Sequence, residues 1–143
     1  MERLQQSFSG AAGTPQSLQR LVNKLVNDFQ PEADRHNTHV VNEVRQEIAL
    51  GTTMQKAAAI LNDLLAAIVT NSRNGEIHIT AERFSDVVIL EIQERNNYNG
   101  YALAFSIDSL APEAAAVGGH ISIKGPQQKI TTISFSFPNN QAA

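Results

Sequence analysis

The chain has 143 residues, which suits one domain and is short for two. It contains no cysteine, so disulfides, thiolate metal sites and cysteine nucleophiles are excluded. Its formal net charge of −3 leaves no basic excess for binding nucleic acid, and its longest apolar run falls short of the ~20 residues of a membrane span. We therefore expect a cytoplasmic protein that binds no nucleic acid and inserts into no membrane.

The amino end reads as a leader followed by a helix. Residues 1–14 are small and polar, with only Leu4 and Phe8 apolar, so we expect this leader to pack poorly by itself. Thr14 followed by Pro15 places a capping hydroxyl before a residue suited to the first helical position. The sequence thus predicts that a helix begins here.

The first predicted helix carries one apolar face. Its apolar residues recur at three-and-four spacing: Leu18, Leu21, Val22, Leu25, Val26 and Phe29. Pro31 lacks an amide hydrogen, which leaves two readings open. The helix either bends there, or ends near Gln30 and resumes for a turn through Arg35.

The middle of the chain predicts a short strand and then a buried helix. Beta-branched residues favour a strand over residues 40–44. From Thr52 or Thr53 the chain is rich in Ala and Leu and apolar almost all round, which is typical of a central helix buried on most sides. Asn74–Gly75 then predicts a turn.

The next two segments alternate between apolar and polar residues and predict a hairpin. Residues 76–82 and residues 88–93 each show this alternation, and Ser85–Asp86 supplies the turn between them. Each strand therefore has one face suited to the core and one suited to solvent.

The carboxyl end predicts a short helix and a second hairpin. Residues 109–117 favour a helix that Gly118–Gly119 stops. Strands are expected over residues 120–124 and residues 130–137. Because every strand alternates cleanly, the helices must share one sheet face. We predict a two-layer α+β sandwich, with a mixed sheet and about three helices on one face.

This order of elements, and two stretches in particular, resemble the ATP-binding domain of sensor histidine kinases, the Bergerat fold. The stretches are ILNDLLAAIVTNSRNGEIHITAERFSDVVILEIQE and GGHISIKGPQQKITTISFSFP. The resemblance spans residues 15–138, so we expect a leader over residues 1–14, this domain over residues 15–138 and a tail over residues 139–143. It implies a two-component signalling protein.

The first motif of that family departs from its pattern here. In the family, the buried helix carries two Asn one turn apart, and the second holds the magnesium that bridges the ATP phosphates. The matching positions are Asp63 and Ala67, and a methyl group cannot ligate a hard cation. Asn71 lies one further turn along the same helix face and is the alternative ligand.

The second and third motifs also depart. The family's Asp-x-Gly-x-Gly, whose carboxylate reads adenine, falls on the stretch that begins at Glu94, with Asn96 and Tyr98 where glycines would sit. A glycine-rich lid is expected to follow, but only Gly100 occurs before Ser109. Together these departures imply a domain that has kept the fold and lost the residues that handle nucleotide.

Two functions follow from the resemblance. One is a degenerate domain with no ATP turnover and no cofactor, which binds a histidine kinase, a response regulator or its own copy. The other is a divergent kinase domain that still binds ATP or ADP with Mg²⁺ at Asp63, Ala67, Asn71, Glu94 and Asn96. A melting temperature that does not change on adding Mg-ATP or ADP would favour the first function, and a clear rise would favour the second.

Several polar residues also have plain structural interpretations. A carboxylate such as Asp63 is costly to bury on so apolar a helix unless it is paired. We expect Asp63 to be either a remnant of the pocket or a residue bonded to nearby backbone or to a Lys or Arg. Glu94 is expected at a solvated strand end. His36 and His39 have a spacing that can hold zinc but lack further ligands, so surface positions in a loop are favoured. Arg73 suits the end of the central helix.

Overall fold

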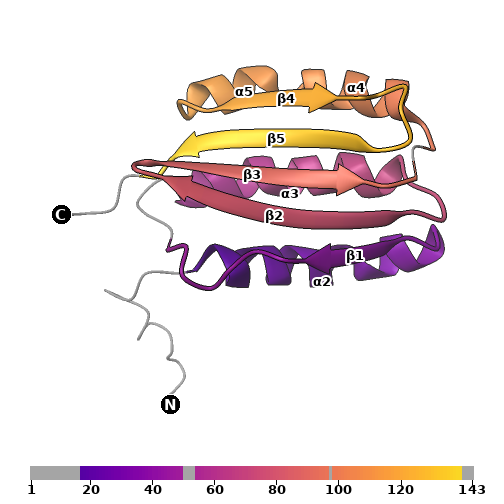
Figure 1. Ribbon diagram of the computed structural model, residues 1–143, viewed down its shortest axis with the longest axis horizontal. Helices are drawn as coiled ribbons and strands as arrows, with labels where there is room; N and C mark the ends of the chain where they lie inside the picture. Colours follow the sequence, from indigo (N-terminus) through magenta and orange to yellow (C-terminus); the bar gives the residue numbers. More distant parts are fainter. Residues whose placement is uncertain (1–16, 50–53, 97, 140–143) are drawn as a thin grey trace, which may run out of the picture.

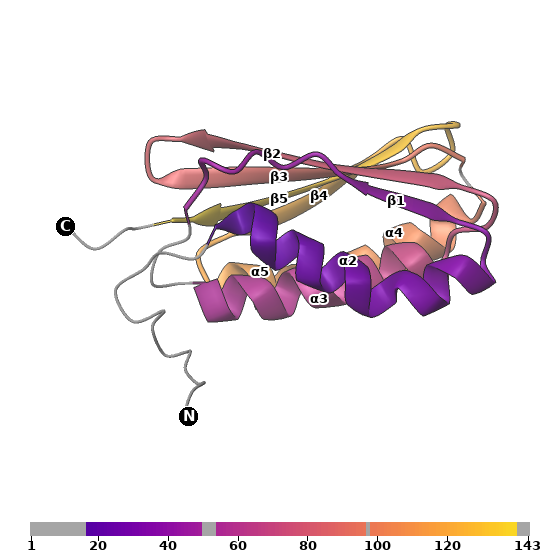
Figure 2. The ribbon, with the colours of Figure 1, turned by 90° about the horizontal axis from the view of Figure 1, so that it is seen from below.

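The computed structural model describes residues 17–49, 54–96 and 98–139 and forms two layers. Figure 2 shows a twisted sheet on one side and all the described helices on the other. The other face of the sheet carries no helix (Figure 1). This confirms the predicted two-layer α+β sandwich.

The sheet has five strands in the order β1-β2-β3-β5-β4. Strand β1 pairs in parallel with β2, and the other three pairings are antiparallel, so the sheet is mixed as predicted. The strands are β1 (His39–Asn42), β2 (Glu76–Phe84), β3 (Val87–Glu94), β4 (His120–Lys124) and β5 (Thr131–Pro138).

Four helices form the second layer in the part of the chain that the structure describes. They are α2 (Leu18–Arg35), α3 (Met54–Thr70), α4 (Gly100–Asp108) and α5 (Ala111–Ala116). Helix α3 lies in the middle, with α2 on the β1 side and α4 and α5 on the β4 side (Figures 1 and 2). None of these helices is long and apolar enough to cross a membrane.

Helix α2 begins later than predicted and runs through its proline. Thr14 and Pro15 lie outside the described residues, and the cap is Ser17, whose side chain accepts a hydrogen bond from the amide of Arg20 at 3.1 Å. Pro31 removes one helical hydrogen bond, and it lies on an exposed face of the helix, where this loss costs least. The helix therefore runs without a break through Pro31 to Arg35 and does not end near Gln30.

The core lies between the sheet and α3. The inward residues of β3 and β5 are fully or almost fully buried, and those of α3 meet them from the other layer. The largest of these are Leu64, Leu65, Ile68, Leu90, Ile92, Ile133 and Phe135. Burial of this apolar surface positions the ends of α3, β2 and β3, where the candidate site lies.

Strand β1 is two residues shorter at its end than predicted. The side chain of Asn42 accepts a hydrogen bond from the amide of Val44 at 3.0 Å, a local turn that competes with the ladder. The two turns of the hairpin region are as expected, because Asn74 and Ser85 adopt left-handed backbone angles, with φ of 53° and 57°.

Helix α4 was not predicted, since only a helix over residues 109–117 was expected there. Asn99 caps α4 by accepting a hydrogen bond from the amide of Ala102 at 3.4 Å. Leu103 and Ile107 face the core, while aromatic residues occupy the opposite side. Apolar residues on both sides hid the amphipathic pattern that sequence reasoning relies on.

Candidate functional site

The predicted nucleotide positions gather at one end of the sheet. There α3 ends, β2 begins and β3 ends, with the segment after β3 leading into α4 (Figure 1). Glu94 and Asn96 come from the β3 side, and Ala67 and Asn71 come from the end of α3. Asp63 lies one turn before Ala67 on the same helix.

Glu94 is buried, and the prediction of a solvated strand end is wrong. Alternation along β3 turns Glu94 toward the helices, and only 2% of the residue is exposed. One carboxylate oxygen accepts a hydrogen bond from the Ser72 hydroxyl at 2.6 Å, and the other accepts one from the amide of Asn96 at 2.7 Å. Both oxygens therefore already have donors from the chain itself.

Ser72 and Thr38 complete this buried group, which sequence reasoning missed. Ser72 is fully buried, and its hydroxyl oxygen accepts a hydrogen bond from the Thr38 hydroxyl at 3.2 Å. In the sequence, Ser72 lies between an apolar helix and the Asn74–Gly75 turn, and this position could have indicated its burial. Such a polar residue is buried only if it has partners.

Residue 75 must be a glycine because the Glu94 carboxylate and the Ser72 hydroxyl lie so close to its Cα. A Cβ atom there would lie 2.5 Å from a Glu94 oxygen and 2.6 Å from the Ser72 hydroxyl. No side chain fits without moving the pair apart. The glycine thus serves the Ser72–Glu94 contact as well as the turn that sequence predicted.

Asn96 closes the other side of the turn. Its side-chain amide donates to the carbonyl oxygens of Arg73 and Asn74, both at 3.1 Å. Its backbone amide is the one that donates to Glu94. Asn96 therefore fastens the segment after β3 to the α3–β2 turn.

The α3 positions offer little to a metal. Ala67 is partly buried against the core, and its side chain carries no oxygen. Asn71 turns back on its own helix, where its side-chain amide donates to the Ala67 carbonyl at 2.9 Å. This hydrogen bond caps the end of α3. The Asn71 side chain, which the sequence offered as the alternative ligand, is thus bound to its own helix.

Asp63 is exposed, so the prediction of a costly buried carboxylate is wrong. Its side chain pairs with no lysine or arginine within the described ranges. Helix α3 is buried on most sides, but Asp63 lies on its solvent-facing strip. Water satisfies the charge there at little cost.

His36 and His39 do not form a metal site. His36 is not at a loop surface as expected, because its ring lies 2.8 Å from the Val69 carbonyl and 3.3 Å from a Glu32 oxygen. His39 is exposed. Among the described residues, no group of three potential ligands of the His, Cys, Asp and Glu types is close enough to hold an ion.

Arg73 follows α3 and binds its last carbonyls. Its guanidinium donates to the Thr70 and Ser72 carbonyls at 3.0 and 2.7 Å, which confirms its predicted place at the helix end. The same group lies over the Tyr98 ring, 5.1 Å from its centroid. It therefore joins the turn to the segment before α4.

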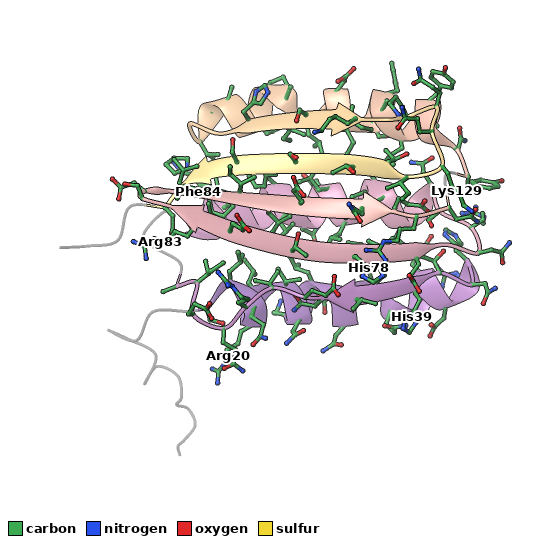
Figure 3. All side chains as sticks on the ribbon, viewed as in Figure 1. Arg20, His39, His78, Arg83, Phe84 and Lys129 are labelled. Atoms are coloured by element: carbon green, nitrogen blue, oxygen red, sulfur yellow. The ribbon has the colours of Figure 1, made fainter. Side chains whose placement is uncertain are left out.

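A different polar group lies on the open face of the same sheet end. The His78 ring bridges two carboxylates, Glu43 at 3.0 Å and Glu76 at 2.8 Å, and Figure 3 shows His78 on the helix-free side. Hydrogen bonding to Glu76, and secondarily to Glu43, raises the pKa of His78 above its ordinary 6.5. The bond to His78 in turn lowers the pKa of Glu76 below 4.5.

The open face also has a hollow of about 600 Å³ toward the other end of the strands. Carboxylates and Phe84 form much of its lining. None of the predicted site residues contributes to it. The hollow is separate from the Glu94 group, which lies beneath the sheet.

Comparison with known proteins identifies the fold. No protein-family model matches the sequence, and no curated protein matches it. Among solved structures, the chain is similar to the Acinetobacter baumannii histidine kinase AdeS, with a TM-score of 0.69 and 15% identity over 87% of this chain and 66% of that one. The chain thus spans just under two thirds of the AdeS chain.

Two further matches involve the histidine kinase ThkA. Its nucleotide-free catalytic domain matches with a TM-score of 0.68 and 17% identity, over 88% of this chain and 95% of that one. ThkA in complex with the response regulator protein TrrA matches with a TM-score of 0.64 and 17% identity, over 89% of this chain and 42% of that one. The chain therefore has the fold of histidine kinase catalytic domains, as the sequence resemblance implied.

Proposed function

We propose that this chain is a histidine-kinase-type ATP-binding-fold domain of a two-component signalling protein that has lost nucleotide turnover and acts by binding another protein. The fold supports the place in signalling, and the complex of ThkA with TrrA supports a response regulator as one kind of partner. The loss of nucleotide handling is argued from the residues at the site.

The observation that carries the proposal is the engaged state of Glu94. A carboxylate that reads adenine must present an accessible oxygen to the base, but Glu94 is only 2% exposed, and each of its oxygens is turned to a donor of the chain, Ser72 or Asn96. Turning the carboxylate toward a base would take it from the buried Ser72 hydroxyl, and an unsatisfied buried donor costs about 1–3 kcal/mol. That cost opposes adenine binding before any contact is made.

The phosphate side supports the same conclusion. Ala67 supplies no oxygen for Mg²⁺, and the Asn71 amide is bound to the Ala67 carbonyl. Where a glycine-rich lid would cover phosphates, α4 begins at Gly100 and packs against α3 and β4. The residues present do not fit Mg-ATP, so no step of catalysis is assigned to them.

A thermal-shift titration tests the proposal. Ligand at ~100 times its dissociation constant stabilises a protein by about 2.7 kcal/mol, or several degrees for a domain of this size. We expect no change in melting temperature with Mg-ATP or Mg-ADP up to millimolar concentration. A saturable rise would support the alternative, a divergent kinase domain that still binds nucleotide.

A further inference from the structure

The helix-free face of the sheet carries an apolar cluster near the β2–β3 turn. Phe84 is 55% exposed and Val87 is 39% exposed, and the two are paired across β2 and β3. Ile89 lies two residues further along β3, so it shares this face, where it is half-buried. Figure 2 shows the described helices on the opposite face, so none of them covers this cluster.

Two carboxylates without partners border the apolar cluster. Glu82 is paired with Ile89, and Glu91 is paired with Thr80, so both point to the same face as Phe84. Among the residues that the structure describes, neither carboxylate has an ion-pair or hydrogen-bond partner. Their negative charges are therefore free to pair with a cation from outside.

These side chains line the hollow of about 600 Å³ on the open face. Its lining includes Phe84, Ile89, Glu82, Glu91, Glu43 and Arg45. Arg45 is bound to Glu47 at 3.0 Å, and Glu43 is bound to the His78 ring at 3.0 Å. With three carboxylates against one engaged cation, the lining of the hollow is acidic.

The other nearby cations do not neutralise the hollow. Arg83 follows Glu82 on β2, but its guanidinium donates to the Ser85 carbonyl in the turn at 3.0 Å. Lys124 and His120 share the helix-free face, but they lie on β4, and β5 separates β4 from β3. Figure 3 shows Phe84 and His78 toward opposite ends of the sheet. The acidic charge therefore stays beside the apolar cluster.

We propose that Phe84, Val87 and Ile89, bordered by Glu82 and Glu91, form a docking groove, here the acidic groove, for a basic amphipathic helix of a partner protein. The apolar stripe of that helix covers the apolar cluster, and its Lys or Arg side chains pair with the two free carboxylates. This inference rests on the proposed function, in which the domain acts by binding another protein, and it names the chemistry of the partner's binding segment.

The size and charge of the acidic groove favour this occupant. From Thr80 to Phe84 the strand extends ~13 Å at about 3.3 Å per residue. A helix of about nine residues has that length and already presents an apolar stripe. A second copy that docked through the same groove would bring like carboxylates together, which opposes association.

The test uses the full chain and three fluorescent synthetic peptides of equal length, with binding measured by fluorescence anisotropy. The first is a helix-forming peptide with leucine along one face and lysine on the flanks of that face. The second has glutamate in place of lysine, and the third has the composition of the first in scrambled order. We expect saturable binding of the first peptide and roughly tenfold weaker binding, or none, of the other two.

Variants of the chain locate the binding site. Phe84→Ala should lower the affinity for the first peptide roughly tenfold. Glu82→Gln/Glu91→Gln should lower it roughly fivefold at about 50 mM salt and by less at about 300 mM. The matched controls, Phe105→Ala and Glu113→Gln, change exposed residues of the helix layer and should leave the affinity within roughly twofold. Melting temperatures check that each variant is folded.

The inference is overturned if the first peptide does not bind, or if the charge-reversed or scrambled peptide binds as tightly. It is also overturned if the groove variants bind like the wild type, or if the wild-type chain self-associates in sedimentation and Phe84→Ala abolishes it, since the occupant is then a second copy. Nucleotide binding is read out separately by thermal shift. Failure of the acidic groove and failure of the proposed function therefore give different results.

Discussion

Two polar groups lie at the same end of the sheet, on opposite faces, and they differ in what holds them. Glu94 faces the helices, is buried, and is bound by two neutral donors, Ser72 and Asn96. His78 lies on the helix-free face, with 14% of its side chain exposed, and is held between two carboxylates, Glu43 and Glu76. The two residues lie on adjacent strands, only one register position apart.

The buried Glu94 group is therefore a fixed part of the structure, whereas the charge of the His78 group on the open face changes with pH. Beneath the sheet, the polar atoms satisfy one another in a tight space, so removing Glu94 leaves the Ser72 hydroxyl and the Asn96 amide without their acceptor. On the open face, water replaces a lost partner, and the interaction depends on protonation. The predictions below test this contrast, from the largest expected effect to the smallest.

Removing the buried carboxylate should have the largest effect. Glu94→Ala leaves the Ser72 hydroxyl and the Asn96 amide without their acceptor and opens a cavity, so we expect a loss of about 3 kcal/mol in unfolding free energy. Urea denaturation measures it. The control Glu91→Ala, on the open face of the same strand, should change stability by less than about 0.5 kcal/mol. Equal effects of the two would remove the contrast.

Crowding the buried group should come next. Gly75→Ala places a methyl 2.5 Å from a Glu94 oxygen and 2.6 Å from the Ser72 hydroxyl, so we expect a loss of about 2 kcal/mol. A double-mutant cycle with Ser72→Ala checks the cause, because removing that hydroxyl relieves half of the clash. Strict additivity of the two changes would show that crowding against the Ser72 hydroxyl is not part of the loss.

A substitution in the His78 group on the open face should change stability only weakly, and only within a limited pH range. The raised pKa of His78 stabilises the fold below about pH 6.5 and ceases to as pH rises through the higher folded value. The lowered pKa of Glu76 stabilises above about pH 4.5 and ceases to as pH falls. The hydrogen-bonded pair of His78 and Glu76 therefore stabilises the fold most between about pH 4.5 and about pH 6.5.

His78→Gln should accordingly lower the melting temperature by about 1–3 °C near pH 5.5 and by less near pH 8.5. His120→Gln is the matched control, since His120 is an exposed histidine on the same face, in β4, and pairs with no described carboxylate. A His78 effect that stays constant across this pH range would contradict the role of its protonation.

Restoring the family's metal-binding residue should do nothing measurable. Ala67→Asn adds an oxygen at the metal position, but Glu94 stays engaged and α4 still occupies the lid's place. We expect no ATP hydrolysis above background in a phosphate-release assay. Detectable turnover in this single variant would show that the pocket was lost at one position only.

The sequence allowed most of the fold to be predicted, because alternation in β2, β3 and β5 and the apolar run of α3 are strong local signals. Helix α4 escaped because Tyr101 and Phe105 are apolar yet exposed. Their exposure is set by how α4 packs on α3 and β4, which a single sequence does not encode locally. The start of α2 was misplaced by a similar competition between two capping residues, Thr14 and Ser17.

The candidate site was predicted by position but not by environment. Motif spacing located Glu94 and Asp63, whereas their burial was predicted the wrong way round for both. The face of Glu94 depends on continuing the β3 alternation one residue further, and its partner Ser72 is 22 residues away in the chain. Such long-range satisfaction of a buried group is a tertiary property.

The central claim is that internal contacts occupy the places where a nucleotide would bind. An NMR titration of the isotope-labelled chain with Mg-ADP tests it at the residues themselves, through the backbone amides of Ala67, Gly75 and Asn96. The account predicts that these amide shifts stay unchanged up to millimolar nucleotide. Saturable shifts confined to these three amides would contradict it.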